Sequence, residues 1–112
     1  MESDKVEQLF ELISQVGLRV YHTSSSEGTW EIEFLSEYMV TYFPGTSEFL
    51  LEKILYDPGS YSEPPSMDTL EVLVAKCPVE IVRRLLIEEA NDLLIGCLEI
   101  MGREDIYVHS YR

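Results

Sequence analysis

Residues 29–44 read TWEIEFLSEYMVTYFP, and this stretch decides the fold class. Its first half alternates apolar side chains with carboxylates, namely Trp30, Ile32 and Phe34 with Glu31 and Glu33. A period of two with one apolar face is typical of a strand that covers a core on one side and meets solvent on the other. Its second half, residues 38–43, is rich in aromatic and β-branched residues and ends at a Pro-Gly pair. This composition predicts a second strand that stops at a turn.

The sequence before this stretch predicts a helix and one more strand. Apolar residues recur at helical spacing between Val6 and Val16, and Gly17 can end the helix in the left-handed conformation. From Leu18 the period changes to two, and a polar loop over residues 24–28 leads back into the next strand. We therefore expect an N-terminal helix followed by a three-stranded antiparallel meander.

The segment after the meander predicts two short helices around a loop. Residues 47–56, from Ser47 to Tyr56, fit a short helix, with a fourth strand as the alternative. Residues 57–66 hold three prolines, which favours an exposed loop. Asp68 is placed to cap a helix over residues 68–77.

The C-terminal third predicts a long helix and a final strand. Pro78 suits the first turn of a helix that runs to Met101 and is stopped by Gly102. The broad apolar stripe of this helix is expected to be its core face. Residues 106–111 alternate again and would join the sheet. The predicted fold is thus α+β: an N-terminal helix, a three-stranded meander, two or three helices including one long C-terminal helix, and a final strand in the sheet.

Composition fits one globular domain over residues 1–112. The chain is 46% apolar and 26% charged, which excludes a disordered or fibrous protein, and two cysteines are too few for a disulfide scaffold. No apolar run is long enough to cross a membrane. Cys77 and Cys97 lie in apolar segments, which favours reduced core thiols and a cytoplasmic location.

The charge balance indicates what kind of partner the protein binds. The net charge is −13, and residues 27–71 contain ten acidic residues and one base, Lys53, giving −9 in this segment alone. Such a field repels nucleic acid and anionic membranes and attracts a basic protein or peptide. We expect the partner-binding surface to combine carboxylates with aromatic anchors, from Glu31, Glu33, Glu37, Tyr38 and Tyr42.

A helical wheel of the long helix predicts a homodimer. Ile81 and Ile95 fall opposite the apolar stripe, among Arg84, Glu88 and Asp92. A two-fold helix pair would bury the isoleucines and pair the arginine with the acids of the other chain. The alternative is that these two isoleucines are ordinary exposed residues, or are covered by another part of the chain.

Motifs for catalysis are missing from the sequence. It has no glycine-rich phosphate loop and no metal-ligand spacing, so no cofactor and no metal are expected. His22 and His109 are candidates for acid–base chemistry, and Glu89 flanks the apolar stripe, where burial would affect it.

The sequence favours a non-enzymatic, acidic protein-interaction module or adaptor that recruits a basic partner. A DNA mimic is one form of this function. Glu31 and Glu33 would lie about 6.8 Å apart on one strand face, however, whereas duplex DNA carries a charge every ~1.7 Å. The alternatives are a subunit or chaperone-like stability factor of a larger assembly, and a small-molecule binder or enzyme with its site between the sheet and the long helix.

Overall fold

The computed structural model describes residues 2–110 and, within them, the side chains of residues 4–102. Two helices flank five consecutive strands: α1 (Glu2–Val16), β1 (Val20–Ser26), β2 (Thr29–Phe34), β3 (Tyr38–Phe43), β4 (Glu48–Asp57), β5 (Ser66–Ala75) and α2 (Pro78–Ser110). The strands form one antiparallel sheet in the order β1-β2-β3-β4-β5. The α+β class is therefore confirmed, with a meander of five strands rather than three.

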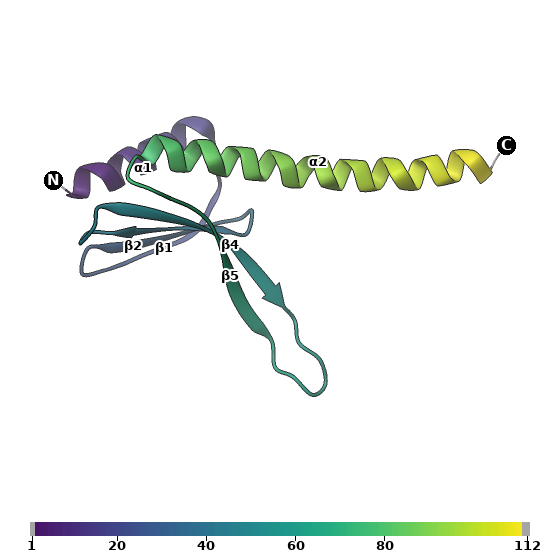
Figure 1. Ribbon diagram of the computed structural model, residues 1–112, viewed down its shortest axis with the longest axis horizontal. Helices are drawn as coiled ribbons and strands as arrows, with labels where there is room; N and C mark the ends of the chain where they lie inside the picture. The colour runs from purple at the N-terminus through teal and green to yellow at the C-terminus, as the bar shows by residue number, and fades with distance from the viewer. Residues whose placement is uncertain (1, 111–112) are drawn as a thin grey trace.

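Both helices lie on the same face of the sheet, and the other face has no helix over it (Figure 1). The core lies between these two layers. It combines one side of α1, the inward positions of the three central strands and the first two turns of α2, and its fully buried members include Leu9, Ile32, Val40, Leu51 and Leu85. As predicted, α1 ends at Gly17, whose φ is +77° and whose N–H donates to the carbonyl of Ile13.

The first hairpin turns more tightly than the sequence suggested. Strand β1 continues through the serines to Ser26, which pairs with Thr29, so the loop is only Glu27 and Gly28. Both loop residues have positive φ, +53° and +83°, as a two-residue type I′ hairpin turn requires. The predicted polar loop over residues 24–28 is therefore mostly strand.

Two predicted helices are strands. Residues 47–56 form most of β4, and the alternative of a fourth strand was the right one. Residues 68–77 were wrongly predicted as a capped helix, since β5 runs from Ser66 to Ala75. The Asp68 carboxylate does accept the Thr69 N–H at 2.9 Å, but on an extended backbone. Short apolar runs are compatible with either a helix or a strand. Here they are strands because β4 pairs with the free edge of β3, and β5 pairs with the free edge of β4.

Strands β4 and β5 continue beyond the sheet as a projecting hairpin. Lys53 is the last residue of β4 that pairs with β3, and residues 54–57 pair only with β5. A register shift between Leu51 and Glu52 inserts one extra residue into β5, and such bulges bend a ladder. The hairpin accordingly swings away from the other strands (Figure 1). Its tip, residues 58–65, is the exposed proline-containing loop that the sequence predicted.

Helix α2 starts at Pro78 as predicted but does not stop at Gly102. It has 33 residues, or about 50 Å at 1.5 Å per residue, whereas the six-residue strands cover ~20 Å. Residues 106–110, predicted as a strand, are helical, because a glycine without a left-handed φ only weakens a helix. Tyr111 lies outside the described residues. The radius of gyration is 17.9 Å, against about 13 Å for a compact chain of this length.

Candidate functional site

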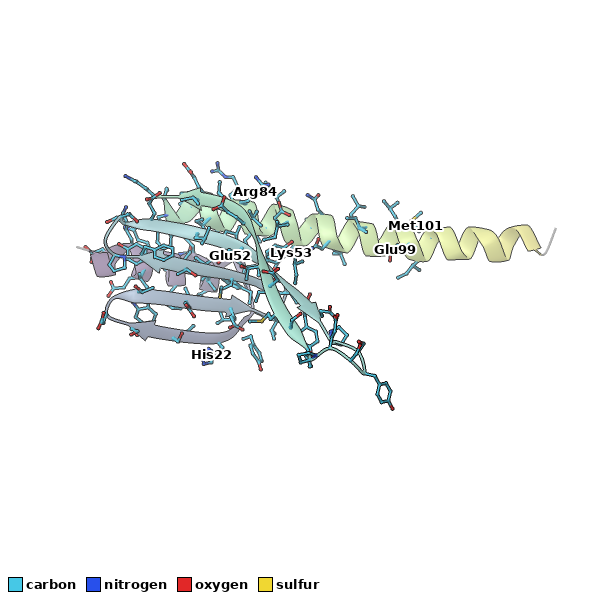
Figure 2. All side chains as sticks on the ribbon, turned by 60° about the horizontal axis from the view of Figure 1, so that its bottom comes forward. His22, Glu52, Lys53, Arg84, Glu99 and Met101 are labelled. Atoms are coloured by element: carbon cyan, nitrogen blue, oxygen red, sulfur yellow. The ribbon has the colours of Figure 1, made fainter. Side chains whose placement is uncertain are left out.

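The uncovered face of the sheet is strongly acidic. Since Ile32, Val40 and Leu51 point into the core, the residues that alternate with them point to the open side. Register then places five glutamates there: Glu31, Glu33, Glu48, Glu52 and Glu71. Figure 2 looks onto this side of the sheet, with Glu52 near its centre and His22 at its β1 edge. We call these five residues the acidic sheet face.

Three of the five carboxylates share one row across the sheet. Pairing runs from His22 to Glu33, Met39, Glu52 and Glu71. Glu52 and Glu71 are direct cross-strand neighbours, and like charges in that position destabilise a sheet. Within the five strands, all of whose residues are described, no lysine or arginine occupies an outward position. Lys53 points inward, and Lys76 follows the end of β5.

Apolar side chains lie between the carboxylates on this face. Met39 and Leu50 are half-buried, and Phe43 and Val74 are 40% and 45% exposed. Carboxylates around a partly apolar centre suit a partner that carries both positive charge and apolar groups, because charge steers the encounter and apolar area holds the complex.

The predicted partner-binding residues divide between the two sides of the sheet. Glu31 and Glu33 belong to the acidic sheet face, and Glu37 is exposed in the β2–β3 turn with φ +68°. Tyr38 and Tyr42 were wrongly expected at the surface. They are 0% and 1% exposed, because the alternation of β3 places them beside Val40 in the core.

The sequence did not identify three members of the acidic sheet face. Glu48, Glu52 and Glu71 lie in segments that were interpreted as helices, where the same residues would point in different directions. The outward Met39 and Phe43 were missed for a simpler reason. The alternation of Tyr38, Val40 and Tyr42 was visible in the sequence, but aromatic residues suit either side of a half-buried strand.

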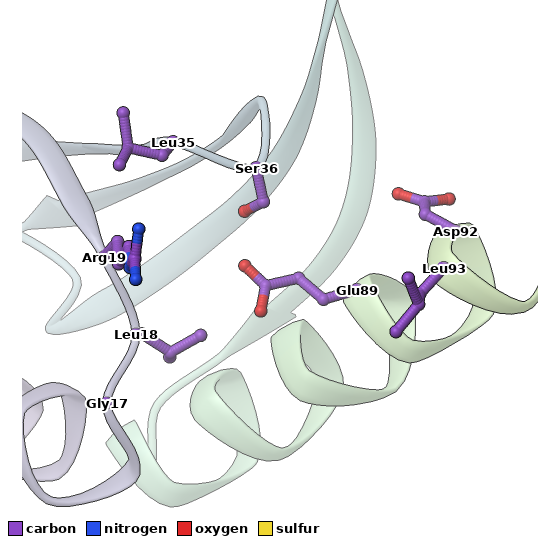
Figure 3. A pocket seen from close by; sticks show the side chains of 8 residues that line it. All are labelled: Gly17, Leu18, Arg19, Leu35, Ser36, Glu89, Asp92 and Leu93. Carbon is purple, nitrogen blue, oxygen red and sulfur yellow. The ribbon is translucent and has the colours of Figure 1, made fainter. Parts of the chain in front are cut away.

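A groove of about 560 Å³ lies on the helical side, where α2 leaves the sheet (Figure 3). Its lining comes from the chain between α1 and β1, the β2–β3 turn and α2: Gly17, Leu18, Arg19, Leu35, Ser36, Glu89, Asp92 and Leu93. Glu89 extends from the helix toward the β2–β3 turn (Figure 3). The Ser36 hydroxyl is buried and lacks a hydrogen-bond partner.

A polar cluster beside this groove joins α2 to the sheet. The Tyr38 hydroxyl donates to Asp92 Oδ2 at 2.7 Å, and Lys53 Nζ lies 3.6 Å from Asp92 Oδ1. The same ammonium is 5.8 Å from the centroid of the Tyr38 ring. Burial raises the pKa of Tyr38 well above the ordinary value for tyrosine, and the hydrogen bond and negative charge of Asp92 raise it further. The phenol therefore stays a hydrogen-bond donor at neutral pH.

The three acid–base candidates are not brought together. Glu89 lines the groove, whereas His22 lies on the opposite, acidic side of the sheet. The His109 side chain lies outside the described residues. None of the eight residues that line the groove is a histidine or a cysteine, so these residues offer polar contacts for a small ligand but no histidine-based nucleophile–base pair.

Four of the five predicted dimer residues face the protein's own body or pair locally. Ile81 is 0% exposed in the core and Asp92 is bonded to Tyr38. Arg84 Nε contacts Glu88 Oε1 of the same helix at 2.7 Å. Only Ile95, at 55%, is a large exposed apolar residue of the predicted set. The placement of Ile81 on an exposed face was wrong, because the sheet and α1 cover that side of the first turns of α2.

Cys77 and Cys97 are free thiols, but both are exposed rather than in the core. Among the described side chains, no three His, Cys, Asp or Glu residues are grouped as metal ligands. Neither helix, over its described residues, combines the length and hydropathy that a membrane crossing needs. No protein-family model, curated protein or solved structure significantly matches this chain.

Proposed function

We propose that this chain is a non-enzymatic protein-interaction module whose acidic sheet face binds a basic protein or peptide. The observation that carries the proposal is the row in which Glu33, Glu52 and Glu71 cross the open sheet without an intervening base. Direct opposition of Glu52 and Glu71 lowers the stability of the isolated protein. A lysine or arginine from a partner would relieve this repulsion. The free energy that the repulsion costs the isolated protein would then favour binding.

The density of carboxylates on the acidic sheet face is too low for a DNA mimic and favours the binding of a short basic segment. Five strands span about 19 Å at ~4.8 Å per strand spacing, and duplex DNA of that length carries about 11 phosphate charges. The acidic sheet face has five carboxylates over the same width. This density matches a short basic segment with a few lysines or arginines, and the half-buried Met39 and Leu50 suit apolar residues between them.

The experiment compares two charge-reversed variants with the same net charge. Glu31→Lys with Glu33→Lys alters the acidic sheet face, and Glu7→Lys with Glu11→Lys alters exposed acids on α1. Each pair of reversals adds four charges to the −13 of the chain, giving −9. Bait proteins are used to capture partners from lysate of the source organism, and captured proteins are quantified by mass spectrometry.

We expect a set of basic proteins that binds the unaltered chain and the α1 variant but not the sheet variant. These partners should be released by about 0.3 M salt, where the Debye length is well below ~10 Å. Identical captured sets for all three baits would refute the proposal. Equal losses from both variants would show that overall charge, and not this face, attracts the partners.

A further inference from the structure

The part of α2 that projects beyond the sheet has one wholly apolar side. At 100° per residue, residues 86–101 place nine apolar side chains within a ~160° sector: Leu86, Ile87, Ala90, Leu93, Leu94, Cys97, Leu98, Ile100 and Met101. We call this set the distal stripe. Its large members are 38% to 71% exposed, which is unusual for so continuous an apolar surface.

Most of the distal stripe faces away from the protein's own sheet. Ile81, Val82 and Leu85 define the buried side of the helix, and Asp92 continues that side through its bond to Tyr38. The centre of the stripe lies on the opposite side of the wheel, while Leu93 at one edge also lines the groove beside the sheet. Figure 2 shows the same division further along, with Glu99 and Met101 on opposite sides of the helix. The chain therefore cannot cover this surface with its own core.

The spacing of the stripe is that of a helix that packs on another helix. Its central line contains Ile87, Ala90, Leu94, Cys97 and Met101, which alternate steps of three and four residues. This is the a/d pattern of a coiled-coil seam, and the small residues at positions 90 and 97 allow two helices to approach closely. A segment of this length without tertiary contacts is also only marginally helical in water.

We propose that the distal stripe pairs two copies of this chain, helix against helix in antiparallel orientation. The stripe itself carries no charged side chain, because Asp92 and Glu99 lie on the other side of the helix. Glu89 lies just outside the edge formed by Leu93 and Ile100. For a protein with a net charge of −13, this is a surface on which two copies meet without opposing carboxylates. Antiparallel pairing also places the two acidic bodies at opposite ends of the helix pair, which lowers their repulsion.

The exposed area is sufficient for a stable dimer. At roughly 100 Å² of exposed side chain each, the seven large members of the stripe present about 700 Å² per chain, close to the ~800 Å² per partner of a standard interface. A membrane surface is a poorer occupant, because helices that lie on membranes carry lysine and arginine on their polar side. Here that side carries Glu88, Asp92 and Glu99.

The test uses two neighbouring residues with the same exposure. Leu94 is 56% exposed in the distal stripe, and Ile95 is 55% exposed on the polar side. Sedimentation equilibrium of the full chain should give twice the 12.9 kDa chain mass. We expect Leu94→Glu to weaken the dimer about 100-fold or more, and Ile95→Glu to leave it unchanged. Circular dichroism checks that each variant keeps its helix and sheet content, and Leu94→Ala replaces Leu94→Glu where the glutamate variant does not fold.

Orientation is tested in a background with Cys77→Ser and Cys97→Ser. Ile87→Cys mixed with Met101→Cys should form a covalent dimer under mild oxidation far faster than either variant alone, because antiparallel helices bring the two ends of the stripe together. Cross-linking of each variant with itself would overturn the orientation. The proposal would be overturned if the unaltered chain is a monomer, or if Ile95→Glu dissociates the dimer and Leu94→Glu does not. It would also be overturned if the chain binds phosphatidylcholine vesicles as a monomer. These outcomes are independent of the binding of a basic partner to the acidic sheet face.

Discussion

The contact between Tyr38 and Asp92 makes the sharpest prediction about stability. Tyr38→Phe keeps the buried ring, so it opens no cavity, and it removes only the hydroxyl that donates to Asp92 Oδ2 at 2.7 Å. Hydrogen bonds to charged groups contribute about 1.5–3 kcal/mol. The Asp92 side chain is 40% exposed and keeps Lys53 at 3.6 Å, so water and the lysine compensate part of the loss. We expect Tyr38→Phe to lower the free energy of unfolding by about 1–2 kcal/mol.

Urea unfolding followed by circular dichroism measures this change. All variants are compared at one protein concentration, because self-association makes the midpoint depend on concentration. Tyr56→Phe is the control, since the same atom is removed from a side chain that is 64% exposed on the projecting hairpin, and its effect should stay within about 0.5 kcal/mol.

A double-mutant cycle with Asp92→Ala assigns the loss to this contact. If the hydroxyl acts through Asp92, Tyr38→Phe should cost little once the carboxylate is absent, leaving a coupling energy of about 1 kcal/mol. Full additivity of the two changes, or a Tyr38→Phe protein as stable as the unaltered chain, would refute the conclusion that this bond holds α2 against the sheet.

Two further predictions concern the same core. The pKa of Tyr38 is raised on folding, so its contribution is complete below the unfolded value near pH 10 and is lost as the pH rises above it. The free energy of unfolding should therefore fall between pH 9 and 11 by up to about 1.4 kcal/mol per pH unit more in the unaltered chain than in Tyr38→Phe, and equal slopes in urea titrations would contradict this. Leu51→Ala removes a fully buried side chain from the central part of β4 and should cost about 2–5 kcal/mol. Leu55→Ala, four residues further on the same strand and 44% exposed, should cost under about 1 kcal/mol, and similar midpoints for both would show that the core does not lie where we place it.

Elements that depend on local sequence were predictable. The bounds of β3, the end of α1 at Gly17 and the start of α2 at Pro78 follow from periodicity, a left-handed glycine and a proline in the first turn. Strands β4 and β5 were not predictable in this way, because their sequences tolerate a helix. Their state depends on a neighbouring strand edge that offers unpaired backbone groups, and that edge comes from residues 38–43.

The candidate sites show the same division between local and nonlocal information. Strand alternation alone placed Glu31 and Glu33 on an exposed face, but their neighbours Glu52 and Glu71 required the register of two more strands. The helical wheel placed Val82 and Leu85 correctly in the core, but it put the buried Ile81 on the exposed side and continued the core stripe into residues 86–101, where it is exposed. Which side is buried depends on where the core ends, and the apolar core includes only the first two turns of the helix.

The two proposed surfaces are compatible in a single assembly. The helix that carries the distal stripe lies on one face of the sheet (Figure 1), and strand register places the acidic sheet face on the other. A dimer formed through the stripe would therefore carry its two sheets at opposite ends of the helix pair and on opposite sides of it, and both acidic faces would remain open and point in opposite directions. Such a dimer cannot place both faces on one compact basic protein, so it would bridge two partner molecules. A long basic partner that reached both faces would gain avidity from the pairing of the helices. Leu94→Glu would then weaken capture of the long partner while leaving the affinity of a single basic peptide for one face unchanged.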